Sequence, residues 1–458
     1  MASISVLPPE LLCLIFSYLD TLSLYEVSLT SKRFNSMSKD LLWKCCRGKT
    51  VYGAISYYAL LRSILENPKL AHHVKKLHAY HDKLVFRCGT GDEAELKLFQ
   101  DAIDTLDIPR EAQKSHLKAA VMYNHGDPLI ALLLCKLPNL QNFILQCGNS
   151  LRWTESILEY AAAGQLDVLK KLHTITVHYI YSDPLQSRLF RVLGLPSVKN
   201  FKAINACIKC NLETTLTPGL SSVENISLIL SDMATNALQP LIQCSKALKS
   251  FVFTCGDSDD EEIPFNPYDA VQALRQHRST LEELTIYMNN RWEIMDKNLP
   301  REKICIGNGL QDFEQLRALR CDMRCVWGFD YVADWREIAS YVAEPDNDLT
   351  DLEVLLPRQT HITDALPRSI ETLVIFDANE MIMPHLEGVR NVKAEQFPFL
   401  KEIIVFFNHL CTVRQFARKT RWELVIDGVK VTLNYINARY RAAEEHYVYE
   451  TVGYDAQH

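Results

Sequence analysis

Glycine is scarce in this sequence, with only 16 glycines in 458 residues, and the common catalytic fingerprints are absent. The chain contains no G-x-x-x-x-G-K-[ST], G-x-G-x-x-G, H-E-x-x-H or G-x-S-x-G motif. Loops that wrap phosphate groups need closely spaced glycines, because their backbone must approach the anion. The sequence therefore predicts a protein that is not an enzyme and that needs no cofactor.

The chain also lacks an excess of basic residues and any long hydrophobic run. It has 49 lysines and arginines against 56 acidic residues, which gives a formal net charge of -7. A dedicated nucleic-acid binder usually needs a basic excess to neutralise phosphates, so we expect no nucleic-acid partner. The longest apolar run, 129–135, is far shorter than the roughly 18 residues of a membrane span. With no secretory signal pattern at the start, we expect no membrane association and a cytoplasmic or nuclear protein.

The 14 cysteines do not form a recognisable disulfide or zinc pattern. Most lie within apolar stretches, which favours reduced and buried thiols. The pairs Cys207-x-x-Cys210 and Cys321-x-x-x-Cys325 each provide only half of a structural zinc site, so we expect no metal. Cys45 and Cys46, next to Lys44, come closest to an electropositive setting for a reactive thiol, and we interpret them as structural.

Residues 7–46 have the pattern of a small helical module. Pro9 suits a first helical turn and Glu10 complements the positive end of a helix. Apolar residues follow at helical spacing: Leu11, Leu12, Ile15, Phe16 and Leu19. Asp20 is expected to end or cap this helix, with a second helix over 22–28 and two short turns over 31–37 and 39–45.

A module of about forty residues buries too little surface to be stable alone. Its apolar faces therefore require a partner protein or a neighbouring domain. Periodicity by itself leaves two alternatives open: a partner-binding module, or a set of helices that caps the domain behind it.

This segment resembles the F-box, from Leu7 to about Cys46. The family pattern is matched by the Leu-Pro pair at 7–8, by 10–12, by the Ser-Lys-Arg-Phe run at 31–34, and by Leu42 and Trp43. The resemblance implies a Skp-type adaptor as partner and, through it, a cullin and a RING protein. It assigns adaptor contact to Leu7, Pro8, Leu11, Leu12, Ile15, Leu19, Leu24 and Val27. Phe34 and Trp43 are expected in the core of the module or at its junction with the next segment.

Behind this module, a motif of the form L-x-x-L-x-apolar recurs along the chain. Clear copies begin at Leu140, Val223, Leu248, Leu281, Leu316, Leu349, Ile370 and Leu400, and weaker copies begin at Val74, Leu169 and Val198. The alternating apolar residues predict short strands, and segments such as 155–163 and 268–276 predict helices between them. Strands separated by helices at short intervals favour parallel pairing.

These repeats resemble leucine-rich repeats, although most copies lack the usual asparagine. We therefore expect an α/β fold: a small helical F-box followed by an irregular leucine-rich-repeat-like solenoid, as in fungal-type F-box proteins with such repeats. The expected domains are 1–48 (F-box), 49–130 (helical connector and first irregular repeat), 131–420 (substrate-binding solenoid) and 421–458 (C-terminal cap or tail).

In such an array the residues between the core leucines point away from the helices, onto the usual recognition face. The candidate substrate-binding residues on this face are Tyr287, Arg320, Val374, Phe376, Ile404 and Phe406. The last repeats are apolar where solvent is expected, which favours either a substrate contact or a covering C-terminal segment. The acidic run 257–262 is expected to be a solvated loop.

Together these features predict a substrate-recognition subunit of a Skp-cullin-F-box ubiquitin ligase with an unknown protein substrate. The competing interpretation is a protein-interaction scaffold that acts without cullin.

Overall fold

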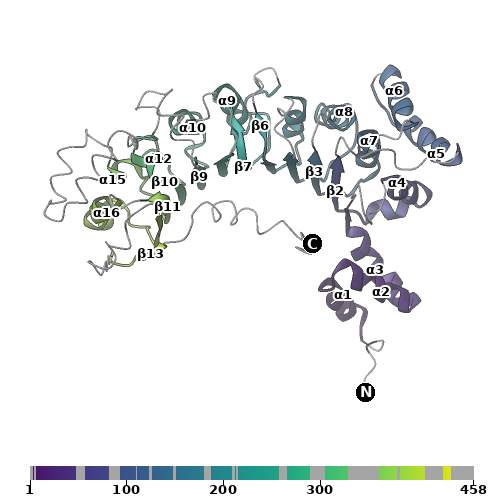
Figure 1. The fold of residues 1–458 in the computed structure, drawn as a ribbon, viewed down its shortest axis with the longest axis horizontal. Coiled ribbons are helices and arrows are strands. Elements are labelled where there is room, and N and C mark those ends of the chain that lie inside the picture. Colours follow the sequence, from purple (N-terminus) through teal and green to yellow (C-terminus); the bar gives the residue numbers. More distant parts are fainter. Residues whose placement is uncertain are drawn as a thin grey trace. The chain divides into compact units, whose positions relative to one another are not determined.

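The computed structural model describes residues 4, 7–47, 57–81, 93–109, 111–122, 126–147, 151–179, 187–208, 212, 215–256, 266–288, 305–327, 361–378, 382–407 and 426–434. The chain divides into two compact units, Met1–Phe201 and Lys202–His458. Helices and parallel strands alternate in both units, so the chain has a mixed α/β fold with helices at its N-terminus (Figure 1). The predicted parallel pairing is confirmed.

The first unit begins with helices and continues with strands that alternate with helices. Its helical elements are α1 (Pro9–Ser17), α2 (Thr21–Thr30), α3 (Lys32–Lys44), α4 (Tyr57–Glu66), η2 (Pro68–His72), α5 (Glu93–Asp104), α6 (Glu111–Met122), α7 (Gly126–Lys136), α8 (Arg152–Ala162) and η3 (Ser187–Gly194). Its strands are β1 (Cys45–Arg47), β2 (Lys76–His81), β3 (Asn142–Cys147) and β4 (Thr174–Tyr179), and β5 (Asn200–Ile204) contains the division between the units.

The second unit continues the alternation. Its strands are β6 (Cys207–Ile208), β7 (Asn225–Met233), β8 (Ser250–Cys255), β9 (Glu283–Tyr287), β10 (Ala318–Asp322), β11 (Thr372–Ala378), β12 (Glu402–Phe407) and β13 (Lys430–Asn434). Its helical elements are α9 (Thr235–Gln243), α10 (Pro267–Leu274), η4 (Arg275–His277), α12 (Met323–Trp327), α15 (Ile362–Ala365) and α16 (Ile382–Gln396).

Within each unit the strands pair in chain order and in parallel. In the first unit β2 pairs with β1 on one side and with β3 on the other, and β3 pairs with β4. In the second unit β7 to β13 follow one another in the same way. Helices α7 and α8 pack together on one side of β2 and β3, and α9 and α10 pack together on one side of β7 to β9 (Figure 1). This one-sided helix layer explains why the inward apolar residues of the strands are buried.

The strands lie where the recurring motif predicts them. In the copy at Leu140, for example, Leu140, Phe143 and Leu145 are all buried, and the strand begins at Asn142. The weaker copies at Val74 and Val198 precede β2 and β5 in the same way. The copy at Leu349 lies outside the described residues.

One detail of the repeat prediction needs correction, and one predicted segment has a described strand. The copy predicted to begin at Leu169 begins three residues later, at Leu172. Leu169 lies in a turn with a left-handed backbone (φ 61°), and β4 begins at Thr174. The segment 421–458, predicted as a cap or tail, contributes strand β13, which pairs in parallel with β12. Part of this segment therefore extends the sheet.

A row of charged residues alternates in sign along one edge of the second unit. We define the pre-strand position as the residue immediately before a strand. Before β7 to β12 it is occupied by Glu224, Lys249, Glu282, Arg317, Glu371 and Lys401. The amide N–H of each donates to the carbonyl oxygen of the previous one, at 2.7–2.8 Å. Neighbouring side chains along this row therefore have opposite charges.

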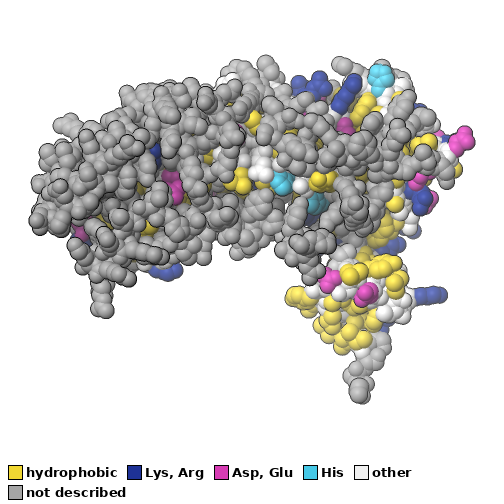
Figure 2. Space-filling view, in the orientation of Figure 1, with side chains coloured by type: hydrophobic (Ala, Val, Ile, Leu, Met, Phe, Trp, Pro, Cys, Tyr) yellow, Lys and Arg dark blue, Asp and Glu magenta, His cyan; other side chains and the backbone are white. Residues whose placement is uncertain are grey.

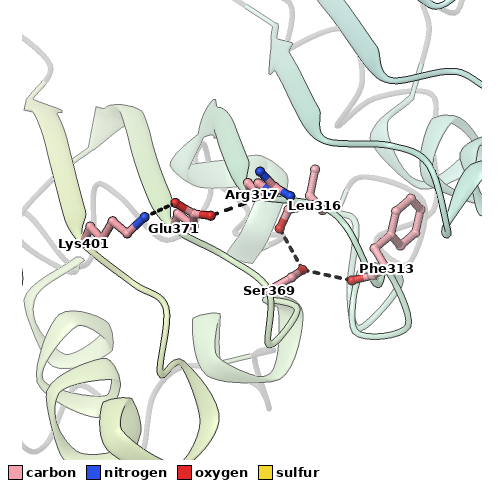
Figure 3. A network of polar contacts seen from close by, with 6 residues as sticks. All are labelled: Phe313, Leu316, Arg317, Ser369, Glu371 and Lys401. Carbon is pink, nitrogen blue, oxygen red and sulfur yellow. Dashed lines mark hydrogen bonds and ion pairs between the residues drawn. The ribbon is translucent and has the colours of Figure 1, made fainter.

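Figure 3 shows one part of this pre-strand row, in which Glu371 lies between two cations. Its carboxylate pairs with Arg317 at 3.9 Å and with Lys401, and these cations and the hydrogen bond from Lys401 lower the pKa of Glu371. Ser369 Oγ donates to the carbonyl oxygens of Leu316 (2.8 Å) and Phe313 (3.1 Å), which ties the turn before β11 to the turn before β10. The row is thus ordered by backbone, hydroxyl and charge contacts together.

Two buried carboxyl groups lie at the junction of α7 and α8. Asp127 accepts hydrogen bonds from the amide groups of Trp153 (2.8 Å) and Thr154 (2.9 Å), so it caps α8 from the neighbouring helix. Glu155, in the first turn of α8, is 3% exposed, and burial raises its pKa to about 7, with a further increase from the negative charge of Asp127.

This raised pKa predicts that Glu155→Gln stabilises the protein in a pH-dependent way. Because the folded-state pKa lies above the unfolded value of 4.5, Glu155 ionises first in the unfolded chain, and the stability of the fold decreases as pH rises from 4.5 to 7. We expect Glu155→Gln to raise the free energy of unfolding by about 2 kcal/mol at pH 8 and by little at pH 4.

Thermal and urea unfolding of both chains at these two pH values measures the difference. The exposed Glu66→Gln serves as the control and should change stability by less than about 0.5 kcal/mol. An equal effect of Glu155→Gln at both pH values would contradict the assignment.

Among the described helices, none is both long enough and apolar enough to cross a membrane.

Candidate functional site

The N-terminal helices are delimited by local capping residues. Pro9 occupies the first turn of α1. Asp20 caps α2, since its carboxylate accepts from the Ser23 amide (2.9 Å) and hydroxyl (2.8 Å), and these hydrogen bonds lower the pKa of Asp20. The Ser31 hydroxyl caps α3 by accepting from the Phe34 amide at 3.1 Å.

The prediction of two short turns over 31–37 and 39–45 is wrong, because α3 runs without interruption from Lys32 to Lys44. No glycine or proline breaks this segment, and Ser38 bonds back to the Phe34 carbonyl oxygen at 2.8 Å without ending the helix. The helix leads directly into β1, so the small module and the first parallel strand share one continuous backbone.

The module has its own small core. Leu12, Phe16 and Leu24 are buried there, at 0%, 2% and 5% exposure. The ring of Phe34 meets that of Phe16 edge to face at a centroid distance of 5.4 Å. The partly buried side chains around this core are Leu7, Leu19, Val27, Phe34, Met37, Leu41 and Leu42. The guanidinium of Arg33 donates to the Leu7 carbonyl oxygen at 2.8 Å and fastens the entry to α1 onto α3.

Around this core, α1 and α2 expose an unusual amount of apolar surface. We define the exposed apolar surface as Leu11 (48% exposed), Leu14 (53%), Ile15 (38%), Tyr18 (82%), Leu22 (69%), Tyr25 (53%) and Leu29 (66%). Of the ten large hydrophobic residues that are exposed in the described part of the chain, eight lie between Ile4 and Leu29. Hydrophobic side chains gather over these helices in Figure 2. A concentration of this kind marks a protein-interaction site.

The helical spacing explains how this surface arises. Leu11, Ile15 and Tyr18 follow one another at i, i+4 and i+7 along α1, and Leu22, Tyr25 and Leu29 do so at i, i+3 and i+7 along α2. Residues with this spacing lie on one face of a helix. Each helix therefore has one apolar face for the module's core and a second one that remains exposed.

Comparison with protein families identifies this module. Residues 4–47 match the F-box-like family model. The chain thus contains an F-box-like domain, and the resemblance found in the sequence is confirmed for this segment. The comparison with curated proteins found no match.

The structure separates the eight predicted adaptor-binding residues of the F-box-like domain into three groups. Leu11, Ile15 and Pro8 are exposed, and Leu7, Leu19 and Val27 are half-buried. Leu12 and Leu24 lie in the domain's core, which corrects their placement on the surface, because they face Phe16 and the α3 side of the domain. Sequence reasoning missed Leu14, Tyr18, Leu22, Tyr25 and Leu29. Helical spacing from Leu11 could have indicated Leu14 and Tyr18, and spacing from Leu22 could have indicated Tyr25 and Leu29.

The predicted substrate-binding residues on the sheet face of the second unit are mostly buried. Tyr287, Val374, Phe376 and Phe406 form a cluster at 5% exposure or less, with Ile404 packed against it. The ring of Phe376 meets Tyr287 at 5.3 Å and stacks on Phe406 at 5.5 Å. Arg320, in the register of Val374, is half-buried and pairs with Glu283 at 3.9 Å. These side chains contact one another across adjacent strands and do not form an exposed patch, and the two alternatives, a substrate contact and a covering C-terminal segment, stay predictions.

The cysteines in the described residues are all free, and several are deeply buried. Burial raises the pKa of Cys46 to about 12, so this thiol stays protonated at neutral pH. Burial also raises the pKa values of Cys321 and Cys325 well above the usual range. Cys210, the second member of the other pair, lies outside the described residues. Among the described residues, no three metal-ligating side chains lie close enough to hold an ion.

Proposed function

We propose that this protein is a substrate-recognition subunit of a Skp-cullin-F-box ubiquitin ligase. The observation that carries the proposal is the exposed apolar surface on α1 and α2, which lies within the segment that matches the F-box-like model. F-box domains generally bind Skp-type adaptors, and an apolar surface of this kind requires a partner. In this proposal the adaptor contacts Leu11, Leu14, Ile15, Tyr18, Leu22, Tyr25 and Leu29, and Leu12 and Leu24 support that surface from inside.

The remainder of the chain, in this proposal, is an irregular leucine-rich-repeat-like solenoid that binds a protein substrate. Its support is the recurrence of the motif with one parallel strand at each described copy, and a helix layer on one side of the strands within each unit (Figure 1). Repeats of this kind bury their leucines by stacking on neighbours and present the other face to partners. The protein itself is non-catalytic, and it acts in the cytoplasm or the nucleus.

Affinity purification of the full chain from cells tests this proposal. We expect a Skp-type adaptor, a cullin and a RING protein to copurify with it. A purified adaptor should also form a stable complex with the purified chain. An adaptor without cullin would favour the cullin-independent scaffold instead. A well-folded chain that binds no adaptor would overturn the F-box function.

A further inference from the structure

The pre-strand row of the first unit differs in charge from that of the second. Its five positions are Lys44, Lys75, Gln141, His173 and Lys199. The backbone links are the same as in the second unit: Lys75, Gln141, His173 and Lys199 each donate an amide N–H to the carbonyl oxygen of the preceding member, at 2.8–3.0 Å. The second unit alternates acids and bases at these positions, whereas the first unit has no acid at all.

The consequence is an edge on which Lys44 and Lys75 add positive charge without an acid at a neighbouring row position. Lys44, Lys75 and His173 are exposed, and no ion pair is found for these three in the part of the chain that the structure describes. In the second unit the corresponding Lys249 pairs with Glu224 at 2.7 Å, and its pKa is raised by Glu224 and Glu282. The ammonium groups of Lys44 and Lys75, which precede adjacent strands, repel each other, so the first unit gains from a bound anion.

Two acidic residues near this edge are already occupied by other partners. Asp40 pairs with His73 at 2.8 Å, and Asp167 pairs with Lys170 at 2.7 Å. Lys171, two residues before His173, donates to Asn139 Oδ1 at 2.6 Å and is exposed, which adds a further cation beside the row. These two carboxylates are therefore paired with cations outside the row.

We propose that this basic pre-strand row binds an acidic, extended segment of a protein substrate. This inference rests on the proposed receptor function, because the bound segment belongs to a substrate only if the chain is a substrate receptor. Adjacent strands are about 4.8 Å apart, so the row spans about 19 Å, the length of about six extended residues. Carboxylates on one side of such a segment recur every 6.7 Å or so and meet the lysines, and the Gln141 amide can donate to one of them.

The chemistry of the row favours a peptide over a nucleic acid. The row contains no Phe, Tyr or Trp, so the imidazole of His173 is its only ring for base stacking, and the whole chain has a net charge of -7, which repels a long polyanion. A short acidic segment has negative charge only where it contacts the row, so the rest of the chain repels it less than it repels a long polyanion.

The test is a binding titration of the full chain with a fluorescent peptide of about ten residues that is rich in glutamate. A peptide with glutamine at the same positions is the ligand control. The variant Lys75→Glu/His173→Glu reverses the row. The matched control Lys97→Glu/His116→Glu makes the same substitutions at exposed sites on α5 and α6.

We expect the glutamate peptide to bind the parent chain, the glutamine peptide to bind much more weakly, and added salt to weaken the interaction. The row variant should lose about tenfold in affinity, and the matched control should stay within about twofold. If the charge reversal prevents folding, Lys75→Gln/His173→Gln replaces it, with a loss of severalfold expected.

Equal loss in both double variants, equal binding of the two peptides, or no binding of the glutamate peptide would overturn the inference. Tighter binding of a single-stranded oligonucleotide of equal charge would overturn the assignment to a peptide. Adaptor binding is measured on the same samples. Loss of peptide binding with adaptor binding intact rejects only this inference, and loss of adaptor binding with peptide binding intact rejects only the receptor function.

Discussion

The double variant Leu11→Ala/Leu22→Ala is expected to bind a Skp-type adaptor about 30- to 100-fold more weakly than the parent chain. Both side chains belong to the exposed apolar surface, at 48% and 69% exposure, one on α1 and one on α2. Truncating two anchor residues of an interface costs about 2–3 kcal/mol, and each 1.4 kcal/mol is a factor of ten in affinity. Because neither residue lies in the core, the stability of the free chain should change little.

Isothermal titration of purified adaptor into each chain measures this effect. Leu220→Ala/Phe399→Ala is the matched control, because these residues are also exposed, at 62% and 57%, and lie outside the F-box-like domain. We expect the control to retain parent affinity. A similar loss in both double variants, or no loss in either, would contradict the assignment of the adaptor to α1 and α2.

Phe16→Ala is expected to destabilise the F-box-like domain by about 3–5 kcal/mol, the usual cost of removing a buried aromatic ring. Phe16 is 2% exposed and packs on Phe34. A domain this small has little stability to lose, so the loss should unfold the helices in the free chain. The exposed Tyr18→Ala, at 82% exposure, should change stability by less than about 0.5 kcal/mol.

Hydrogen exchange of the α1–α3 amides distinguishes these variants, with protection lost in Phe16→Ala and retained in Tyr18→Ala. Saturating adaptor should restore part of the protection in Phe16→Ala, because a ligand that binds only the folded form shifts the equilibrium towards it. Full protection of α1 in free Phe16→Ala would show that the core is not where the structure places it.

The positions of the strands in the sequence are the part of the fold that could be predicted best. Leu140, Phe143 and Leu145 are apolar because they face the helix layer, and the alternation is visible in sequence since strand side chains point to opposite faces in turn. The same reasoning found the strands after Val223, Leu248, Leu281, Leu316, Ile370 and Leu400. It failed at Leu169, where a left-handed turn moves the start of the motif three residues towards the C-terminus.

The division of the apolar residues in α1 and α2 could not be predicted. Leu11 and Leu12 are adjacent leucines in one helix, and only the position of α3 decides that Leu12 is buried while Leu11 is exposed. The family pattern shows which positions are apolar, but it does not show which of the two apolar faces of each helix packs in the core of the domain. The packing of Phe34 against Phe16 settles that choice.

The contacts between the aromatic residues on the sheet face could not be predicted either. Phe376 and Phe406 lie in the consecutive strands β11 and β12, and they stack because these strands pair in parallel. A repeat motif gives the direction in which each side chain points, but the contact between rings depends on the neighbouring strand. The contacts within this cluster are thus decided by the strand pairing.

The sequence by itself determined the F-box-like segment, the places of the strands and the parallel order, because these depend on local periodicity and on short connections. The tertiary structure alone decided which apolar side chains of α1 and α2 are exposed and which charges become neighbours. Lys75 and His173 are separated by 98 residues of chain, and only strand pairing brings them into one row with Gln141 between them. Local preferences act within a few residues, whereas burial and charge pairing depend on contacts that only the folded chain creates.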